Sequence, residues 1–556
     1  MLKIALLINS NSLNKIENDF LNLAQKSSDY SVELIIIQAN CEKEKNLKPM
    51  ANFFDQFLRK IYGFTIFLDR FFARNYSLLK NSQETISIRS FTIPHVIINT
   101  SPKPNTAFLD KTELLNLQKK EIDLIASCYF TNAENNFHLF AKMGLLEIFH
   151  GSDSSPGLQH GPIGFYEVLE KNPITMFKIF HNKEEIPQSS PYMQGSIATV
   201  FPFILNKYRV ERKAISFLHN FIQKLSISQS SLNFDTSVSS EHRPTVPAIY
   251  QSYDSPPSLI SLLRYIWIGA IHGFKALYAR LMQSHGKWSV GLIKNSKNSK
   301  NWKNINFNDL NVIPNSPNHY LADPFLFSLD QLEYCFVEDY SFITQKGNIK
   351  AFLLDGNKII DQGTVLDEPF HLSYPNIFKV GNDIFMIPET AENKDIRIYK
   401  STTFPSKWVL HKQLMKDISA ADTNILFYKD RWWMFTNIDS ADIEDYCSEL
   451  HIFYADAFDS NRWIPHSQNP VITSALQARN GGCIVDESEL FRAFQAQDYG
   501  FYGKSMGIAK INTLTPDEYS ETIVHSICPD FIPNIQGTHH IHFKDKMVAI
   551  DFFSKS

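Results

Sequence analysis

The chain has 556 residues, which is too long for a single hydrophobic core and predicts two or three domains. A hydrophobic content of 44% with 20% charged residues excludes an intrinsically disordered chain. A formal net charge of −4 argues against nucleic acid as a partner. The six cysteines are far apart and form no CxxC pair, so free thiols in a reducing, cytoplasmic setting are expected. No run of 18 apolar residues is present, so no transmembrane helix is expected.

The chain opens with the pattern of a βαβ unit. Residues 2–9 and 32–38 read as strands, and residues 13–25 between them read as a helix. This order predicts an open, mostly parallel α/β sheet of the Rossmann-like type. The turn after the first strand reads NSNS and holds no glycine, so NAD is not expected as a cofactor.

A helix rich in phenylalanine and basic residues is predicted over residues 53–79. Such a pattern fits a helix packed into a core. It also fits a helix that lies on a membrane surface. Both interpretations stay open.

A histidine ends a predicted strand further along the chain. Residues 145–150 read as a strand, and His150 is followed by a loop rich in glycine and proline and then by a helix. Open α/β sheets bind ligands at the carboxyl ends of their strands, so this loop is a candidate site.

This stretch resembles the formyltransferase fold of methionyl-tRNA and sugar formyltransferases. His150 matches the family histidine and Gly161-Pro162 matches the family loop, while Ile148 stands where the family has asparagine. The resemblance implies an α/β domain over residues 1–225, a catalytic role for His150 and a binding role for Gly161 and Pro162. Formyl-tetrahydrofolate or a nucleotide sugar would be its cofactor, although the sequence requires neither.

A linker and a long helix follow this domain. Residues 226–257 are rich in serine and proline, which is typical of a linker, and residues 258–283 have a helical pattern with aromatic and basic residues. The helix is predicted either to dock the two domains or to touch the inner face of a membrane peripherally. Residues 226–284 are therefore assigned to the connection, and residues 285–556 to a second domain.

Five segments of the second domain repeat one layout, a polar residue at a strand entry followed by a short apolar run. They are YLADPFLF (320–327), LSYPNIF (372–378), ADTNILF (421–427), NGGCIV (480–485) and THHIHF (538–543). Their equivalent points, Asp323, Tyr374, Asp422, Gly481 and His540, are 51, 48, 59 and 59 residues apart. A period near 50 with several strands in each unit predicts an all-β, five-bladed propeller. Residues 288–293 are predicted to complete the last blade, because closure removes exposed strand edges.

The innermost strand of each propeller blade begins at the central channel, so polar residues at these positions are expected to meet there. Glycoside chemistry needs two carboxylates, and the candidates are Asp323, Asp422, Glu338 and Glu389. Tyr374, Arg479, Asn480, His539 and His540 are the candidate substrate-binding residues. Arginine binds phosphate or carboxylate in bidentate fashion, and histidine can bind a hydroxyl or move a proton. No third ligand accompanies the histidine pair, so no metal is expected.

Several motifs of this domain resemble the N-terminal domain of the glucosamine inositolphosphorylceramide transferase family. They are ADPF (322–325), Glu338, HLSYP (371–375), IPE (387–389), ARNGG (478–482), YG (502–503) and HH (539–540). The domain is also similar to the five-bladed arabinanase and invertase-type glycosidases, whose first-blade aspartate is catalytic. The resemblance implies a carbohydrate-active transferase of bacterial surface glycan or glycolipid biosynthesis, with a glycan, glycolipid or nucleotide-sugar substrate in the propeller channel.

Three other functions remain open. The first is formyl or acyl transfer to an amino sugar or nucleotide sugar through the N-terminal domain. The second is glycoside hydrolysis, which paired carboxylates permit. The third is glycan binding without catalysis.

Overall fold

The structure is a computed structural model with two compact units, Met1–His272 and Gly273–Ser556. It describes residues 1–39, 49–74, 76, 79, 85–99, 117–129, 140–151, 162–182, 191–228, 256–282, 286–294, 305–356, 358–485, 489–544 and 547–555. The domain boundaries predicted from the sequence stay predictions.

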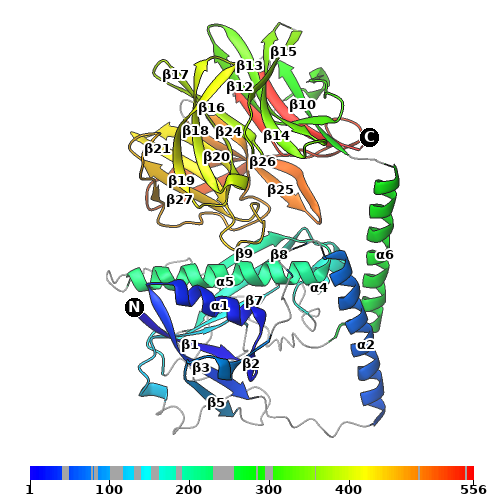
Figure 1. Cartoon of the computed structure of the whole chain (residues 1–556), viewed down its shortest axis with the longest axis vertical. Coiled ribbons are helices and arrows are strands. Elements are labelled where there is room, and N and C mark those ends of the chain that lie inside the picture. The colour runs from blue at the N-terminus through cyan, green and yellow to red at the C-terminus, as the bar shows by residue number, and fades with distance from the viewer. Residues whose placement is uncertain are drawn as a thin grey trace. The chain divides into compact units, whose positions relative to one another are not determined.

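The first unit is built on a seven-stranded sheet of order β5-β3-β1-β6-β7-β8-β9 (Figure 1). The strands β5 to β7 of that order are parallel, and β8 and β9 run antiparallel to their neighbours. The bounds are β1 Leu2–Ile8, β3 Tyr30–Ala39, β5 His95–Asn99, β6 Leu124–Ser127, β7 Leu145–His150, β8 Ile174–Asn182 and β9 Met193–Ala198. The predicted open, mostly parallel α/β sheet is therefore confirmed. A short pair, β2 Ser12–Leu13 and β4 Ile86–Ser87, lies apart from this sheet.

Both faces of the sheet are buried, which explains why its strands read as continuous apolar runs. Along β1, Leu2, Ile4 and Leu6 enter one core and Ala5 and Leu7 enter another. The helices α1 (Lys15–Lys26) and α5 (Phe203–Ser228) cover the first of these faces (Figure 1). The sequence predictions above contain no helix at α5, which is the main element they missed.

Among the described residues, three further α-helices are α2 (Pro49–Phe72), α4 (Phe165–Glu170) and α6 (Leu259–Met282). The predicted helices over 53–79 and 258–283 correspond to α2 and α6 where the chain is described. In the described residues, no helix has the length and apolar character needed to cross a membrane.

The second unit is a five-bladed β-propeller, as predicted. Four blades are antiparallel sheets of four consecutive strands each. They are β12 His319–Leu329, β13 Leu332–Ser341, β14 Lys346–Asp355 and β15 Lys358–Leu366; β16 Ser373–Val380, β17 Asp383–Glu389, β18 Asp395–Thr403 and β19 Lys407–Lys416; β20 Ala420–Tyr428, β21 Arg431–Ile438, β22 Leu450–Ala455 and β23 Ile464–Pro465; and β24 Asn480–Val485, β25 Leu490–Asp498, β26 Phe501–Leu514 and β27 Tyr519–Ile527.

The fifth blade joins the two ends of the propeller. It contains β28 Ile535–Gly537, β29 Ile541–Lys544, β30 Met547–Ser554, β10 Lys287–Lys294 and β11 Asn311–Val312. The strand β10 pairs antiparallel with β30 over its whole length, so the predicted closure by residues 288–293 is confirmed. The innermost strands contact each other in a closed ring of order β12, β16, β20, β24 and β29.

The innermost strand of every blade is irregular at the repeated position, through a β-bulge in four blades and a break in the fifth. In the first four blades the register shifts between Ala322 and Phe325, Ser373 and Asn376, Ala421 and Asn424, and Asn480 and Cys483. In the fifth blade the strand is broken between β28 and β29. Asp323, Tyr374 and Asp422 have positive φ angles of 49°, 47° and 48°. Residues other than glycine rarely have a positive φ, and those that do cluster at functional sites. In the first three blades, the bulge therefore re-aims the side chain of Asp323, Tyr374 or Asp422 at the repeated position.

Candidate functional site

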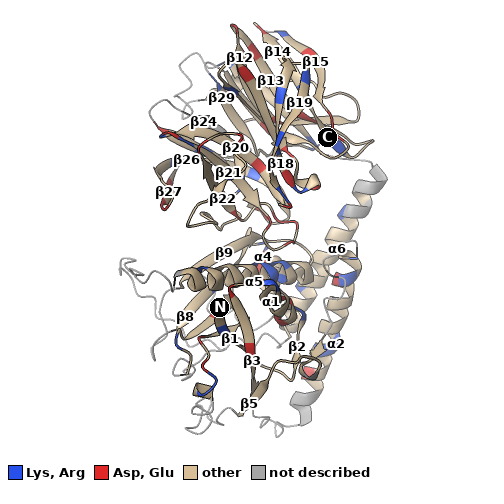
Figure 2. Cartoon of the chain, turned by 60° about the vertical axis from the view of Figure 1, so that its left-hand side comes forward, with Lys and Arg blue, Asp and Glu red and all other residues tan. Residues whose placement is uncertain are grey.

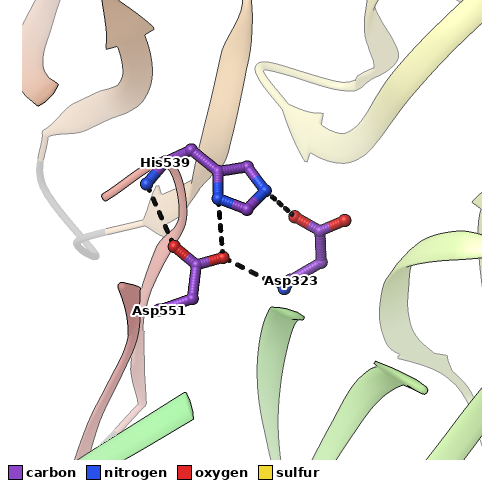
Figure 3. A group of neighbouring side chains, drawn as sticks. All are labelled: Asp323, His539 and Asp551. Atoms are coloured by element: carbon purple, nitrogen blue, oxygen red, sulfur yellow. Dashed lines mark hydrogen bonds and ion pairs between the residues drawn. The ribbon is translucent and has the colours of Figure 1, made fainter. Parts of the chain in front are cut away.

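At the centre of the propeller, His539 lies between two carboxylates (Figure 3). Its Nε2 is 3.2 Å from Asp323 Oδ1, and its Nδ1 is 3.0 Å from Asp551 Oδ2. Asp551 on β30 is held by backbone groups, since the N–H groups of His539 and His540 donate to its Oδ1 and that of Asp323 donates to its Oδ2. All three side chains are buried. Asp551 therefore ties the bulges of the first and fifth blades together through the histidine.

The electrostatics of this trio favour a charged imidazolium and a charged Asp323. Burial alone would lower the pKa of His539, but the charges of Asp551 and Asp323 outweigh it and raise that pKa to about 10. Burial alone would raise the pKa of Asp323, but its contacts with His539 and His540 hold it below its ordinary value. Asp323 is thus an ionised carboxylate inside a buried cluster.

Glu338 lies near Asp323, but its pKa is shifted in the opposite direction. It lies on β13, where its residue pairs with Ala322 beside Asp323. Burial, followed by the negative charge of Asp323, raises its pKa well above the ordinary value. The Nε2 of His371 is 3.6 Å from Glu338 Oε1, and burial lowers the pKa of that histidine. The pKa of Glu338 is therefore raised beside Asp323, whose pKa is lowered. Two carboxyl groups with separated pKa values are the arrangement that acid–base catalysis uses.

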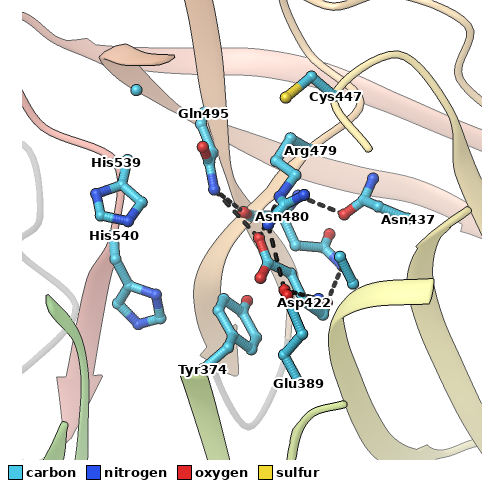
Figure 4. Close-up of polar contacts among 12 residues, drawn as sticks. Tyr374, Glu389, Asp422, Asn437, Cys447, Arg479, Asn480, Gln495, His539 and His540 are labelled. Atoms are coloured by element: carbon cyan, nitrogen blue, oxygen red, sulfur yellow. Dashed lines mark hydrogen bonds and ion pairs between the residues drawn. The ribbon is translucent and has the colours of Figure 1, made fainter. Parts of the chain in front are cut away.

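A second cluster joins Asp422, Arg479 and Glu389 (Figure 4). The Nε of Arg479 donates to Asp422 Oδ2, and its Nη2 donates to Glu389 Oε2 at 3.3 Å. Burial and the charges of Glu389 and Asp323 raise the pKa of Asp422 against the attraction of Arg479. Gln495 Nε2 also donates to Asp422 Oδ2 at 3.2 Å. One guanidinium thus neutralises two carboxyl groups that come from different blades.

Three predicted substrate-binding residues are fully buried and packed into the channel wall. Tyr374 accepts hydrogen bonds at its hydroxyl from Asn424 Nδ2 and from the N–H of Gly482. Asn480 Nδ2 donates to the carbonyl of Asp422 at 2.8 Å. The ring of His540 lies against Tyr374 with centroids 5.0 Å apart, and its Nδ1 is 3.5 Å from Asp323 Oδ1. These contacts hold the bulges of neighbouring blades in position.

Asp323, His539 and Asp551 could also be considered as metal ligands, because their ligand atoms lie within 4.8 Å of one another. A metal needs a deprotonated imidazole nitrogen. The raised pKa of His539 favours a proton there, and both ring nitrogens already face carboxylates. The donor set is therefore better suited to holding a proton than to holding a metal ion.

The candidate site residues predicted from the sequence did not include Asp551, Gln495 or Tyr502, although Tyr502 belongs to the YG motif (502–503). Asp551 is the single acidic residue of the apolar run MVAIDFF, a signal that could have identified it. Tyr502 is 44% exposed, its ring lies 5.4 Å from that of His539, and the guanidinium of Arg479 lies 5.8 Å from it. It is therefore a solvent-accessible aromatic ring next to both clusters, in a position to stack on a sugar.

In the first unit, His150 ends β7 and is buried, with its ring 6.2 Å from that of Tyr129. Burial lowers its pKa to about 3, so it is neutral at neutral pH. Gly161 lies outside the described residues, and Pro162 is buried. The roles predicted for these three residues stay predictions.

A cavity of about 430 Å³ lies in the first unit at the point where the strand order reverses. In the sheet, β3 lies on one side of β1 and β6 lies on the other, so the strand order reverses between β1 and β6. Open α/β sheets bind ligands at such a switch point. Asn9 after β1 and Tyr129 after β6 line the cavity. The lining also contains basic side chains and a further aromatic ring, namely Lys15, Arg70, Lys207 and Phe203. Two buried acids, Glu17 and Glu211, also line it, and burial raises the pKa of Glu17 to about 7 and that of Glu211 above its ordinary value. Lys15 pairs with Asp19 at 2.7 Å and Lys207 with Glu211 at 3.7 Å, so acids of the chain hold two of these three cations.

The charged state of His539 should make the propeller lose stability at alkaline pH. A folded-state pKa of about 10 lies above the ordinary 6.5, so the contribution is complete below pH 6.5 and is lost as pH rises towards 10. At pH 6.5 we expect His539→Gln to lower the free energy of unfolding by roughly 2–4 kcal/mol. Near pH 10 the same substitution should lower it by much less, because the wild-type histidine then loses its charge. Urea unfolding followed by tryptophan fluorescence at both pH values measures this gap. The matched control is His411→Gln, whose ion pair with Asp459 is partly exposed. An equal difference in unfolding free energy between wild type and His539→Gln at both pH values would contradict a charged His539.

Comparison with known proteins gives matches in the second unit. Residues 307–531 match the family described as "Glucosamine inositolphosphorylceramide transferase 1, N-terminal". The rice (Oryza sativa subsp. japonica) glucosamine inositolphosphorylceramide transferase 1 is 35% identical over 219 residues, which are 38% of this chain and 28% of that protein. The Arabidopsis thaliana protein of the same name is 32% identical over 219 residues, 37% of this chain and 28% of its own length. The chain thus spans less than a third of these relatives.

Among solved structures, a family 117 glycoside hydrolase from Zobellia galactanivorans covers 48% of this chain and 90% of its own at 9% identity, with a TM-score of 0.32. The Bombyx mori β-fructofuranosidase BmSUC1 covers 43% and 56% at 12% identity, also with a TM-score of 0.32. Likenesses at this level carry no functional conclusion.

The matched segment includes Asp323, Glu338, Glu389, Asp422 and Arg479, while His539 and Asp551 lie beyond it. Over residues 307–531, the propeller is similar to the N-terminal domain of the glucosamine inositolphosphorylceramide transferase 1 family.

Proposed function

We propose that the chain is a carbohydrate-active transferase that works in glycolipid synthesis, with its acid–base chemistry in the propeller channel. One observation carries this proposal. Within one buried cluster the pKa of Asp323 is lowered by His539 and the pKa of Glu338 is raised by burial, so the two carboxyl groups are biased towards opposite charge states.

This pair can serve glycosyl transfer from a nucleotide sugar. The ionised Asp323 accepts the proton of an acceptor hydroxyl as that oxygen attacks the anomeric carbon. The bond between this carbon and the phosphate oxygen breaks, and a nucleoside diphosphate leaves. Glu338, whose raised pKa favours its protonated form, donates a hydrogen bond to the leaving oxygen or to a sugar hydroxyl. The relatives' names suggest a glucosamine donor and an acceptor with an inositol phosphate headgroup.

The cavity of the first unit supports a second ligand site. Arg70 provides a cation for a phosphate or carboxylate, and Tyr129 and Phe203 provide aromatic walls. Lys15 and Lys207 also line the cavity, where they pair with Asp19 at 2.7 Å and with Glu211 at 3.7 Å. A nucleotide or formyl-tetrahydrofolate fits this chemistry. If the ligand is the latter, the alternative function is formyl transfer to an amino sugar, with His150 as its central residue.

A product assay tests the proposal. The full chain is incubated with nucleotide sugars and an inositol-phosphate glycolipid, and products are measured by mass spectrometry. We expect a glycolipid heavier by one sugar and an equal amount of nucleoside diphosphate, both dependent on the acceptor. Release of free sugar from a glycan without any nucleotide sugar would identify a hydrolase instead. Formylated amino sugar made only with formyl-tetrahydrofolate would move the function to the first unit.

A further inference from the structure

The outer side of α2 carries a stripe of exposed phenylalanines. Phe53, Phe57, Phe64, Phe67 and Phe71 follow a helical spacing of three, four or seven residues, and their exposed fractions lie between 44% and 77%. On the opposite side of the same helix, Thr65 and Asp69 are buried. A soluble protein seldom exposes so many aromatic rings on one face without a partner for them.

The neighbouring helix α6 carries a second stripe of the same kind. Ile260, Leu263, Trp267 and Ile271 recur every three or four residues, with exposed fractions between 38% and 71%. Leu262 and Tyr265 on the other side of this helix are buried. Together, these nine side chains on α2 and α6 are called the aromatic face below.

A buried hydrogen-bond cluster fixes the orientation of both helices. The hydroxyl of Tyr265 on α6 donates to the carboxylate of Asp69 on α2, 2.8 and 2.9 Å from its two oxygens. The N–H of Phe203 at the start of α5 donates to the Tyr265 hydroxyl at 2.8 Å, and that of Ile204 donates to Asp69 Oδ2 at 3.3 Å. In Figure 1, α2 and α6 run beside each other. The two stripes are therefore held outward by the packing of the first unit.

Basic side chains adjoin the aromatic face (Figure 2), and one of them, Arg264 on α6, pairs with Glu170 at 3.2 Å. Lys60 and Arg74 adjoin the α2 stripe, and Arg74 lies 4.6 Å from the ring of Phe71. Among the described residues, neither has an ion pair. The acidic residues of α2 are Asp55, which pairs with Arg59 at 3.0 Å, and the buried Asp69, and the sequence of α6 contains no Asp or Glu.

We propose that the aromatic face docks onto the surface of a bilayer that contains anionic lipids. Amphipathic helices with aromatic residues on one side and basic residues at its edge lie in the interface between headgroups and acyl chains. Cations beside the apolar stripe attract anionic headgroups, which gives the surface charge complementarity to a membrane. The inference rests on the exposed helices alone, so it does not depend on the chemistry proposed for the propeller.

Vesicle sedimentation of the full chain tests this inference without any activity measurement. We expect vesicles of phosphatidylcholine with phosphatidylglycerol to bind the chain on the order of 10-fold more tightly than phosphatidylcholine alone, with binding weakened by salt. Phe64→Ser with Phe67→Ser, and separately Trp267→Ser, should each weaken binding about 10-fold or more. Lys60→Glu with Arg74→Glu should remove the preference for anionic vesicles.

Phe427→Ser is the matched control, because Phe427 is an equally exposed aromatic residue on the propeller. It should leave vesicle binding unchanged, and the melting temperatures of all variants should match that of the wild type. Absence of binding to both kinds of vesicle would overturn the proposal. So would a stoichiometric dimer in solution that Trp267→Ser dissolves, because the face would then be a protein interface.

Discussion

Asp323→Asn is expected to reduce turnover by about 1,000-fold while the propeller stays folded. The amide has nearly the same shape as the carboxylate, but it carries no charge and cannot accept the proton of an acceptor hydroxyl. Asp323 is ionised in a buried site because of His539, so the amide also removes the partner that this imidazolium faces. The turnover number measured with saturating donor and acceptor reports the loss.

Two controls separate chemistry from folding in this experiment. Asp355→Asn makes the same change at an exposed position of the same blade and should leave turnover unchanged. The wild type and Asp323→Asn should still bind the nucleotide sugar with similar affinity, since the proposed role lies in the chemical step. An Asp323→Asn variant with at least half of the wild-type turnover would refute the assignment of Asp323 as the base.

Arg479→Met is expected to be the most destabilising single change at the site. It leaves the buried Asp422 and the partly buried Glu389 without their shared cation, which costs roughly 3–5 kcal/mol for a buried ion pair broken on one side. For a unit of this size, the melting temperature of the propeller should fall by roughly 10 °C. Calorimetry of the full chain, with the two units followed as separate transitions, measures the shift.

The double variant Arg479→Met with Asp422→Asn provides the decisive comparison. It removes the unpaired buried charge, so it should recover much of the stability lost in the single variant. Arg462→Met is the control for loss of an arginine at an exposed position. The pairing of Arg479 with Asp422 would be contradicted if Arg479→Met unfolded with a free energy within about 1 kcal/mol of the wild type. It would also be contradicted if the double variant lost the sum of the stability losses of the two single variants.

The propeller could be predicted from the sequence because its repeat is local. Each inner strand has its own turn signals, a polar residue where the strand begins and a short apolar run. The period near 50 can therefore be recognised in the sequence without knowledge of the tertiary contacts. The structure adds the reason for the polar residue, a bulge in four of the five blades, with positive φ at Asp323, Tyr374 and Asp422. The first unit was readable for the same reason along β1, β3 and β7, where apolar runs are bounded by turns.

The pairing of the polar residues could not be predicted, because it depends on which blades are neighbours in space. The sequence suggested four candidate carboxylates without showing which of them pair. The structure associates Asp323 with His539 and Asp551, and Asp422 with Arg479. Asp551 lies on β30, well away in sequence from the residues that it orients. The helix α5 was missed although Val210, Ala214 and Phe217 recur at helical spacing, because polar residues interrupt the pattern on its other side.

The central claim is that sugar chemistry takes place in the propeller channel. A crystal structure of the full chain with a nucleotide sugar and a short acceptor glycan tests it most directly. The account predicts a sugar ring beside Tyr502, with a hydroxyl within hydrogen-bond distance of Asp323. A sugar bound only in the cavity beside Lys15 and Lys207, with the channel empty, would contradict it.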